Sequence, residues 1–175
     1  MKKYFAFLRA INVGGTTIVK MTDLKKMFES FGLENVQTYI QTGNVIFESQ
    51  EGNSSALEER IERQLEEVWG KRIRLFVRTM REVVAMADEC PYHPKDGETA
   101  YVAILQKRPD KKTVQALMAL CSEADDFVVK GKEAYALRID REKSIFSNHL
   151  IEKTLGVSGT TRNLTTIKKL AEKYN

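Results

Sequence analysis

The strongest constraint on the fold is an order of hydrophobic patterns that occurs twice along the chain. In residues 4–78, segments with strand-like and helix-like spacing of apolar residues follow one another as strand, helix, strand, strand, helix, strand. Residues 99–175 begin with the same order, strand, helix, strand, strand, helix, and then add a last helix. The first order is that of two split βαβ units. The sequence therefore predicts an α+β chain with two ferredoxin-like (βαββαβ-type) subdomains, the second with extra C-terminal helices.

The first half carries start and stop signals at the ends of its elements. An apolar run from Tyr4 to Ile11 predicts the first strand, and Thr22 is expected to cap a helix that stops at Gly32. Two short strands joined by a tight polar turn follow. The spacing Ser55-x-x-Glu58 predicts a capping box at the start of a long helix, after which another strand completes the unit.

The second half carries similar signals but is expected to end differently. Thr79-x-x-Glu82 predicts a capping box for a connecting helix, and Asp110 is expected to cap the next helix. Ser147 opens a further helix. A linker rich in Ser, Gly and Thr then leads to a final helix from about Asn163, in the place where a closing strand would be expected.

The predicted subdomains are joined by a segment with turn-forming residues. We expect residues 1–78 to form the first ferredoxin-like subdomain and residues 99–175 the second, which includes the C-terminal helices. Residues 79–98 then form a connecting helix and linker, in which Pro91 and Pro94 stand close together. The order of elements alone carries this division, since the halves share no evident sequence identity.

Composition limits the kinds of partner and location. The net charge is +4 and the pI about 9.0, which permits an anionic partner, although 30% of the residues are charged and the two signs are interspersed. Cys90 and Cys121 do not make a disulfide framework and are expected to be reduced thiols. The opening apolar run is short and contains Arg9, and no apolar stretch approaches the roughly 20 residues of a membrane span. We therefore expect a cytoplasmic protein without membrane contact.

The stretch after the first strand resembles a ligand site more than a packed core. Arg9 interrupts the apolar run, so its guanidinium must reach the strand end, a carboxylate or a ligand. Asn12 offers an amide, and Gly14 and Gly15 allow backbone N–H groups to approach an anion. Lys20 adds a charge just before a helix start. These residues predict a phosphate- or carboxylate-binding surface; the alternative is a plain glycine loop with a solvated lysine and an ion-paired arginine.

A second polar group lies in the turn Gln41-Thr42-Gly43-Asn44. A turn needs only Gly43 and Asn44, which tolerate left-handed backbone angles, so Gln41 and Thr42 are surplus to the turn. Gln41 and Asn44 join the candidate ligand-binding residues. We expect this hairpin at the opposite end of the sheet from the loop after the first strand, unless short strands let the side chains converge.

Near the C-terminus, Arg162 and Asn163 stand at the start of the last predicted helix. Asn163 is explained as an N-cap and is also a candidate ligand-binding residue. Arg162 is unusual because a cation is unfavourable beside a helix N-terminus, so we expect it to hold an anion or to pair with the other half of the chain.

Metal and nucleophile signals are weak. Cys90-x-x-His93 could reach four zinc ligands only with the distant Cys121 and His149, so no metal site is predicted, and no cofactor. A Ser-His-Asp or Cys-His arrangement remains open, because such residues meet in space rather than in sequence.

A long first block and a late segment are similar to a known bacterial family. The first block comprises FLRAINVGG (Phe7 to Gly15 with the preceding aromatic residue), Val19-Lys20-Met21 with Leu24 and Gly32, and Val36-x-Thr38-Tyr39-Ile40-Gln41-Thr42-Gly43-Asn44-Val45. The late segment is Thr161-Arg162-Asn163-x-x-Thr166. They resemble the family catalogued as domain of unknown function 1697. The resemblance implies two ferredoxin-like subdomains and no established activity. The family often has Trp after the late Asn, where this chain has Leu164.

These observations lead to one leading expectation and two alternatives. We expect a binding module whose basic and polar cleft takes an anionic ligand: a nucleotide, a phosphorylated metabolite or single-stranded nucleic acid. RNA binding of the sheet type would need exposed aromatic residues, which Phe5, Phe7 and Tyr39 could supply only on an uncovered face. The alternatives are a small hydrolase or transferase using the same cleft, and a structural or partner-binding protein.

Overall fold

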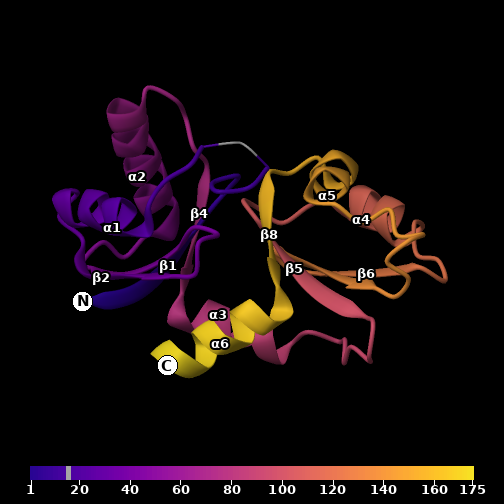
Figure 1. Ribbon diagram of the computed structural model, residues 1–175. Coiled ribbons are helices and arrows are strands. Elements are labelled where there is room, and N and C mark those ends of the chain that lie inside the picture. The colour runs from indigo at the N-terminus through magenta and orange to yellow at the C-terminus, as the bar shows by residue number, and fades with distance from the viewer. Residues whose placement is uncertain (15–16) are drawn as a thin grey trace. The chain divides into compact units, whose positions relative to one another are not determined.

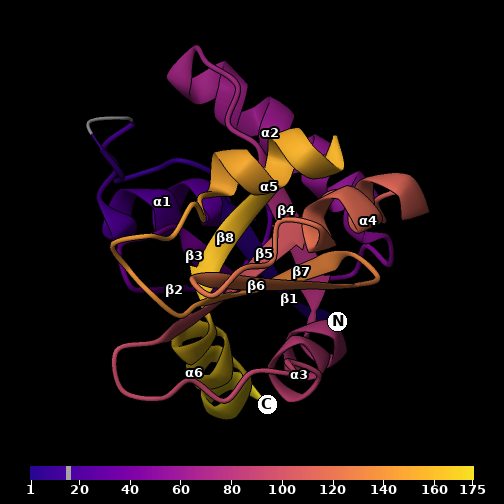
Figure 2. The ribbon, with the colours of Figure 1, turned by 90° about the vertical axis from the view of Figure 1, so that its right-hand side faces the viewer.

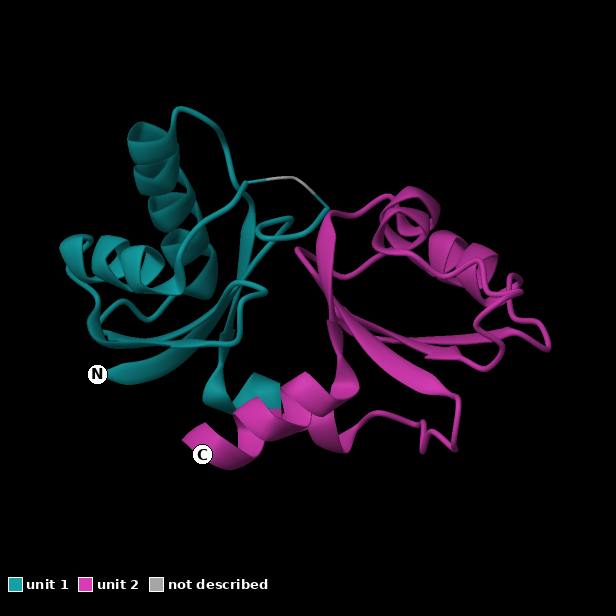
Figure 3. Cartoon of the chain, in the orientation of Figure 1, with its two compact units in different colours: residues 1–83 teal, residues 84–175 magenta. Residues whose placement is uncertain are grey.

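The computed structural model describes residues 1–14 and 17–175, which form two compact units. Unit 1 comprises residues 1–83 and unit 2 residues 84–175 (Figure 3). The boundary falls within helix α3 (Met80–Asp88). Each unit has its own four-stranded antiparallel sheet, so the prediction of an α+β chain with two similar subdomains is confirmed.

Unit 1 follows the predicted order of elements. In chain order these are β1 (Lys2–Leu8), α1 (Met21–Ser30), β2 (Glu34–Tyr39), β3 (Asn44–Ser49), α2 (Ser54–Trp69) and β4 (Leu75–Thr79). The strands are arranged as β2-β3-β1-β4, and every neighbouring pair is antiparallel. Helices α1 and α2 lie on one face of this sheet (Figure 1). Alternate residues of β1, such as Tyr4, Ala6 and Leu8, join the core beneath the helices.

The edge strand β4 is bonded along its outer side by two glutamates of α2. Glu58 Oε1 accepts a hydrogen bond from Val77 N at 2.7 Å, and Glu62 Oε1 accepts one from Leu75 N at 3.1 Å. An edge strand otherwise presents unpaired N–H groups. Residues four apart lie on one helix face, so Glu58 and Glu62 together serve β4.

Two predicted helix caps in unit 1 are wrong. Helix α1 starts after Lys20 rather than at Thr22, and no side chain caps it. The cap of α2 is Asn53, whose Oδ1 accepts hydrogen bonds from the N–H groups of Ser55 and Ala56. The predicted capping box fails because Glu58 is held by Val77 of β4, a tertiary contact that local spacing does not reveal.

Unit 2 repeats the arrangement of unit 1. After the second part of α3 come β5 (Thr99–Leu105), α4 (Lys111–Met118), β6 (Asp125–Lys130), β7 (Glu133–Arg138), α5 (Asn148–Leu155), β8 (Gly159–Asn163) and α6 (Leu164–Tyr174). Its strand order, β6-β7-β5-β8, matches that of unit 1 when β5 is set against β1. Figure 2 shows α4 and α5 on one face of this sheet and α6 on the other.

The second unit does have a closing strand, contrary to the prediction of a linker. Residues Gly159–Asn163 form β8, which pairs antiparallel with β5 and places Arg162 opposite Val102. The segment GTTRN has no apolar alternation, so its sequence is typical of a linker. Its strand identity comes from pairing with β5, which is a long-range interaction.

The remaining helix-start signals are confirmed. The side chains of Asp110, Ser147 and Asn163 each accept a hydrogen bond from a backbone N–H in the first turn of α4, α5 and α6, respectively. The Thr79–Glu82 capping box of α3 is also present, with Glu82 Oε2 accepting from Thr79 N at 2.7 Å. Among the described helices, none is long and apolar enough to cross a membrane.

Candidate functional site

The loop after β1 and the β2–β3 turn lie at the same end of the first sheet, so the prediction of opposite ends is wrong. Since β1 and β3 are antiparallel, Phe7 near the end of β1 pairs with Asn44 at the start of β3. Leu8 N also donates to Gly43 O at 2.9 Å. The candidates of both segments are therefore neighbours at one end of unit 1.

Asn12 is used to hold this end together. Its Nδ2 donates to Val19 O and to Gln41 O, each at 2.9 Å, and its Oδ1 accepts from Val19 N at 2.8 Å. The side chain thus joins both sides of its own loop and the neighbouring turn. Asn12 is a structural clamp in this arrangement, with its amide bonded to protein.

Asn44 and Gly43 are also structural. Asn44 is 1% exposed and begins β3, where its Nδ2 donates to Tyr39 O and Thr42 Oγ1 at 3.0 Å. It does not take the left-handed conformation expected of a turn residue, which Gly43 adopts with φ of +79°. A Cβ on Gly43 would lie 2.7 Å from Ile11 Cδ1, so only glycine fits against the end of β1.

The other candidates of this end are more open. Lys20 and Gln41 are exposed, as is Gly14, which has φ of +56°. Arg9 is half-buried, and its backbone N donates to Arg74 O at 2.8 Å. Gly15 lies outside the described residues. Lys20 and Gln41 therefore present polar side chains to solvent at this end of unit 1.

The backbone at this end is held in an unusual conformation. Ala10, Asn12 and Ile40 have φ values of +55°, +54° and +50°, in the left-handed region that costs most for a β-branched residue such as Ile40. Val13 and Ile18 expose 56% and 83% of their surface nearby in sequence. Such local strain persists only where surrounding contacts impose it, here the Asn12 clamp.

Arg162 and Asn163 end β8 in unit 2. Arg162 is 7% exposed, and its Nη1 donates to Thr160 Oγ1 at 2.8 Å and to Thr161 O at 3.0 Å. Burial lowers its pKa to about 10, so the side chain remains charged at neutral pH. Arg162 is a residue of strand β8 and does not belong to α6, whose N-cap is the neutral Asn163.

Asn163 lines a cavity of about 400 Å³ in unit 2. The cavity lies where β5 begins and where β7 and β8 end, because antiparallel pairing sets Thr99 beside Arg138 and Tyr101 beside Asn163. Its lining residues are Gly97, Glu98, Thr99, Tyr101, Arg138, Arg141 and Asn163. One carboxylate and two guanidinium groups give the lining a net positive charge.

An aromatic pair supports one of the two arginines. The rings of Tyr101 and Phe146 stack with centroids 4.6 Å apart, and Arg138 Cζ lies 5.3 Å and 5.5 Å from the two centroids. Contacts of this kind fix the plane of a guanidinium. The loop carrying Phe146 is anchored by Asp125, whose carboxylate accepts hydrogen bonds from Ser144 Oγ and Ile145 N.

The polar groups of this cavity retain unused donors. Arg138 Nε is buried without a hydrogen-bond partner, and neither Arg138 nor Arg141 forms an ion pair with any carboxylate of the described residues. Asn163 Oδ1 accepts from Thr165 N at 2.9 Å, which directs its Nδ2 away from the helix backbone. The N-terminus of the 11-residue helix α6 adds a partial positive charge at the same edge.

Comparison with known proteins places the chain in a family. The model described as "Protein of unknown function (DUF1697)" matches residues 1–135, more than three quarters of the chain. The chain belongs to this family. The match ends before the late segment Thr161 to Thr166, and a comparison with curated proteins gives no match.

A solved structure shares the fold of this DUF1697 chain. It is "the structure of conserved bacterial protein SP0830 from Streptococcus pneumoniae", with 20% sequence identity and a TM-score of 0.77. The similarity covers 99% of this chain and 98% of that one. At this identity the likeness concerns the fold, and it extends over both subdomains.

Sequence reasoning missed most of the cavity of this DUF1697 chain. Arg138, Arg141, Tyr101 and Phe146 belong to no local motif, and only Asn163 was a candidate. One available signal was Arg138, which follows Ala134 and Ala136 on the alternating face that packs under helices. A cation at the end of such a face, with aromatic residues elsewhere in the unit, indicates a partly buried guanidinium.

No metal centre is evident in the part of the chain that the structure describes, where no three His, Cys, Asp or Glu side chains are placed to hold an ion. Cys90 and Cys121 are free thiols. Cys90 lies with its Sγ 4.0 Å from Tyr92 O, and Cys121 lies with its Sγ 3.0 Å from Asp126 Oδ1.

Proposed function

We propose that this protein binds a small anionic ligand, a nucleotide or other phosphorylated metabolite, in the unit 2 cavity lined by Arg138, Arg141 and Asn163. The observation that carries the proposal is the buried Nε of Arg138, which has no acceptor among the described residues. A buried donor of a charged group costs free energy when it is left without a partner. A ligand oxygen would supply that partner.

The charges and shape of the cavity suit a phosphate or carboxylate group. The planar fork of a guanidinium donates two parallel hydrogen bonds to such a group, and Arg141 adds a second cation at the same cavity. The N-terminus of α6 and the Asn163 amide add further donors, and Glu98 is the one carboxylate among the described lining residues. Glu98 is engaged in a turn, where its Oε2 accepts from Lys95 N.

A ligand with a flat ring fits the aromatic side of the cavity. Tyr101 lines the cavity, and the guanidinium of Arg138 lies against the Tyr101 and Phe146 rings. A nucleotide combines a flat base with phosphate, which makes it the preferred member of the class. Base stacking on the first sheet plays no part in the proposal, because Phe5 and Phe7 are 1% and 0% exposed.

Binding rather than chemistry is proposed because the cavity offers few reactive groups. Among its described lining residues there is no Cys, His or Ser, and the hydroxyls of Thr99 and Tyr101 have no base paired with them by a hydrogen bond. An activated nucleophile needs such a base within reach. A hydrolase or transferase using this cavity is therefore the less favoured alternative.

Calorimetric titration with inorganic phosphate, AMP, ATP and a short single-stranded RNA, at low and high salt, tests the proposal. We expect AMP or ATP to bind at low salt, with Arg138→Gln weakening affinity about 10- to 100-fold, the loss typical of one hydrogen bond to a charged group. Lys112→Gln removes an exposed cation of α4 outside the cavity and serves as the matched control.

Two results would exclude an anion site at Arg138. One is the absence of binding of every anion at low salt. The other is equal affinity of the Arg138→Gln and Lys112→Gln proteins, since binding would then reflect net charge alone. Thermal unfolding of both variants establishes that each is folded. Preference for the RNA over AMP and ATP would assign the cavity to nucleic acid and reject the small-ligand proposal.

A further inference from the structure

A buried carboxylate lies beside Arg138 without pairing with it. Asp125 of β6 and Arg138 of β7 are register partners, so their side chains leave neighbouring strands on the same face of the second sheet. Such partners have Cβ atoms about 4.5–5.5 Å apart, and opposite charges at these positions attract each other. Among the described side chains, however, these two form no ion pair, and Arg138 Nε has no hydrogen-bond partner. Other groups must therefore satisfy the Asp125 carboxylate.

The loop between β7 and α5, residues 139–147, supplies those groups. Ser144 Oγ donates to Asp125 Oδ1, and Ile145 N donates to Asp125 Oδ2 at 2.8 Å. Asp125 is 1% exposed, so water cannot replace either donor, and a buried carboxylate oxygen without a donor is costly. Each oxygen of Asp125 thus has a hydrogen-bond donor that does not belong to Arg138.

The same loop gives the guanidinium of Arg138 a different place to lie. Phe146 N donates to Ser144 Oγ at 3.1 Å, so the hydroxyl that holds Asp125 also orients Phe146. Phe146 stacks on Tyr101, and Arg138 Cζ lies 5.3 Å and 5.5 Å from the centroids of the Tyr101 and Phe146 rings. Because Tyr101 lines the cavity of the proposed anion site, these ring contacts hold the guanidinium at that cavity.

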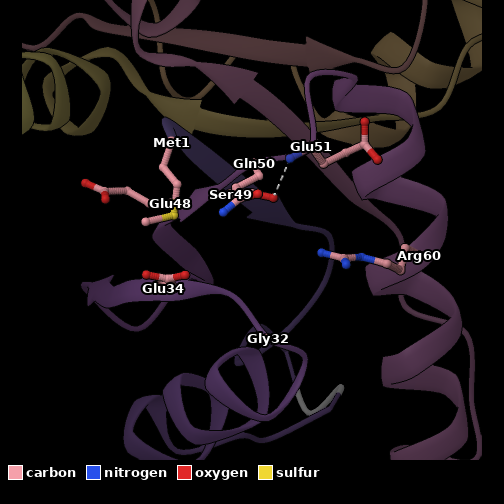
Figure 4. A pocket seen from close by; sticks show the side chains of 8 residues that line it. All are labelled: Met1, Gly32, Glu34, Glu48, Ser49, Gln50, Glu51 and Arg60. Atoms are coloured by element: carbon pink, nitrogen blue, oxygen red, sulfur yellow. Dashed lines mark hydrogen bonds between the residues drawn. The ribbon is translucent and has the colours of Figure 1, made fainter.

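Unit 1 has a comparable pair of opposite charges on neighbouring strands. Lys3 of β1 is the register partner of Glu48 of β3, which lines a cavity of about 490 Å³ (Figure 4). Glu48 is half-buried, accepts a hydrogen bond from Asn35 Nδ2 at 2.8 Å, and points away from Arg60 on the other side of the cavity. Solvent can share the charge of Glu48, whereas the enclosed Asp125 depends on donors from the protein alone.

We propose that Ser144 and Asp125 are positioning residues of the anion site: the Ser144 hydroxyl occupies Asp125, and without it the carboxylate would pair with Arg138 and withdraw the guanidinium from the cavity. The inference rests on the proposed function and adds a control on its affinity. Neither residue is among the described residues that line the cavity, so both act through Arg138. Any fraction of molecules in which Arg138 is paired with Asp125 is lost to ligand binding, which lowers the apparent affinity in proportion.

A measurement on the ligand-free full chain tests the competition directly. The Nε–H resonance of Arg138 in a proton–nitrogen correlation spectrum is assigned by its absence in Arg138→Gln. In Ser144→Ala we expect this resonance to move downfield, because Nε–H then donates to a carboxylate oxygen, which makes a stronger hydrogen bond. Ser144→Thr keeps the hydroxyl and should keep the wild-type position.

Affinity for AMP and ATP, measured by calorimetry at low salt, is the second readout. We expect Ser144→Ala to weaken binding about tenfold and Ser144→Thr to leave it unchanged. Adding Asp125→Asn to Ser144→Ala should restore affinity to within about threefold of wild type, because a neutral amide does not compete for a guanidinium. Residues that only anchored the loop would give the opposite result, since the second substitution would loosen the loop further.

Asp125→Asn alone gives a check that does not depend on Ser144→Ala being folded. Asparagine can accept from Ile145 N and donate to Ser144 Oγ, so the loop keeps both contacts and affinity should not fall. A tenfold loss in this variant, on the order of one charge-assisted hydrogen bond, would make Asp125 a simple loop anchor and overturn the proposal. Thermal unfolding establishes that each variant is folded.

Three further results would overturn the positioning role. They are an unmoved Arg138 resonance with unchanged affinity in Ser144→Ala, equal losses in Ser144→Ala and Ser144→Thr, and weaker binding by the double variant than by Ser144→Ala. If neither AMP nor ATP binds the wild-type chain, the proposed function itself fails. The position of the Arg138 resonance in Ser144→Ala still decides in that case whether Asp125 competes for Arg138, so the two failures are distinguishable.

Discussion

Glu62 and Glu152 make the same contact in the two units. Glu62 of α2 accepts a hydrogen bond from the N–H of Leu75, the first residue of β4, and Glu152 of α5 accepts one from Gly159, the first residue of β8. Both distances are 3.1 Å. Both strands are edge strands, β4 pairing with β1 and β8 pairing with β5. The shared contact shows that the units repeat the same architecture in detail as well as in element order.

The correspondence includes the residue one helical turn nearer the N-terminus of each helix. Glu58 accepts from Val77 N, at the third position of β4, and Asn148 Oδ1 accepts from Thr161 Oγ1, at the third position of β8. The penultimate residues of the two strands are arginines, Arg78 and Arg162, each of which donates to the carbonyl oxygen of the residue before it. The second helix of each unit thus fixes the edge strand from which a buried arginine projects.

Removing Glu62 should destabilise unit 1. Glu62→Ala leaves the N–H of Leu75 without its acceptor and also breaks the ion pair with Arg72, so we expect a loss of about 1–3 kcal/mol in the free energy of unfolding. Urea unfolding followed by circular dichroism measures it. Glu59→Ala, an exposed position on the same helix, should change the value by less than about 0.5 kcal/mol. Equal values for the two variants would contradict the role given to Glu62.

Gly43→Ala should cost more than an alanine at another left-handed glycine. Alanine in the left-handed region costs about 1–2 kcal/mol, which is the expected effect of Gly70→Ala, where a Cβ meets nothing within 4 Å. At Gly43 the Cβ also meets Ile11 Cδ1 at 2.7 Å and Leu8 Cβ at 3.1 Å, which adds about 1–3 kcal/mol of overpacking. Urea midpoints of the two variants measure the difference. Ile11 is 1% exposed, so Ile11→Ala is itself destabilising, and the clash is tested by a double-mutant cycle. Gly43→Ala should cost less in the Ile11→Ala background than in the wild type, and equal costs in the two backgrounds would contradict the clash.

The elements that sequence reasoning predicted well are those with local signals. Asp110, Ser147 and Asn163 cap their helices because an oxygen two or three residues from an N–H needs no distant partner. By contrast, β8 was missed because GTTRN has neither alternation nor apolar content, and only pairing with β5 makes it a strand. The cap at Ser55 was wrong for a related reason, since Glu58 is taken by Val77.

The candidate sites divide along the same line. The segment around Asn12 was recognised from its local composition, but its amide is bonded to Val19 and Gln41, which sequence spacing does not indicate. The cavity in unit 2 joins residues from the start of β5, the end of β7 and the end of β8. Its arginines were not predicted because strand register, rather than proximity in sequence, brings Arg138 beside Thr99.

Replacing Asn12 should loosen the loop after β1. Asn12→Ala removes all three side-chain hydrogen bonds and leaves alanine at φ of +54°, so we expect faster hydrogen exchange at Val19 N, which donates to Asn12 Oδ1. Asn12→Asp retains the acceptor for Val19 N but loses both donations, to Val19 O and to Gln41 O, and sets a carboxylate oxygen against these two carbonyl oxygens. Protection of Val19 should therefore be intermediate between the wild type and Asn12→Ala. Unchanged exchange in Asn12→Ala would contradict the clamp.

Cys121 should be alkylated slowly for an exposed thiol. Desolvation raises its pKa first, and its hydrogen bond to Asp126 raises the pKa further, since a carboxylate favours the protonated thiol. Because the thiolate is the nucleophile, a raised pKa lowers the reactive fraction at neutral pH and moves the midpoint of the rate against pH upward. Iodoacetamide labelling with site-resolved mass spectrometry measures this profile. Asp126→Asn should lower the midpoint partway, because desolvation remains, whereas Glu123→Gln changes an exposed acid that does not bond to the thiol and should leave it in place. A midpoint at that of an ordinary thiol, or one that Asp126→Asn does not move, would contradict the assignment.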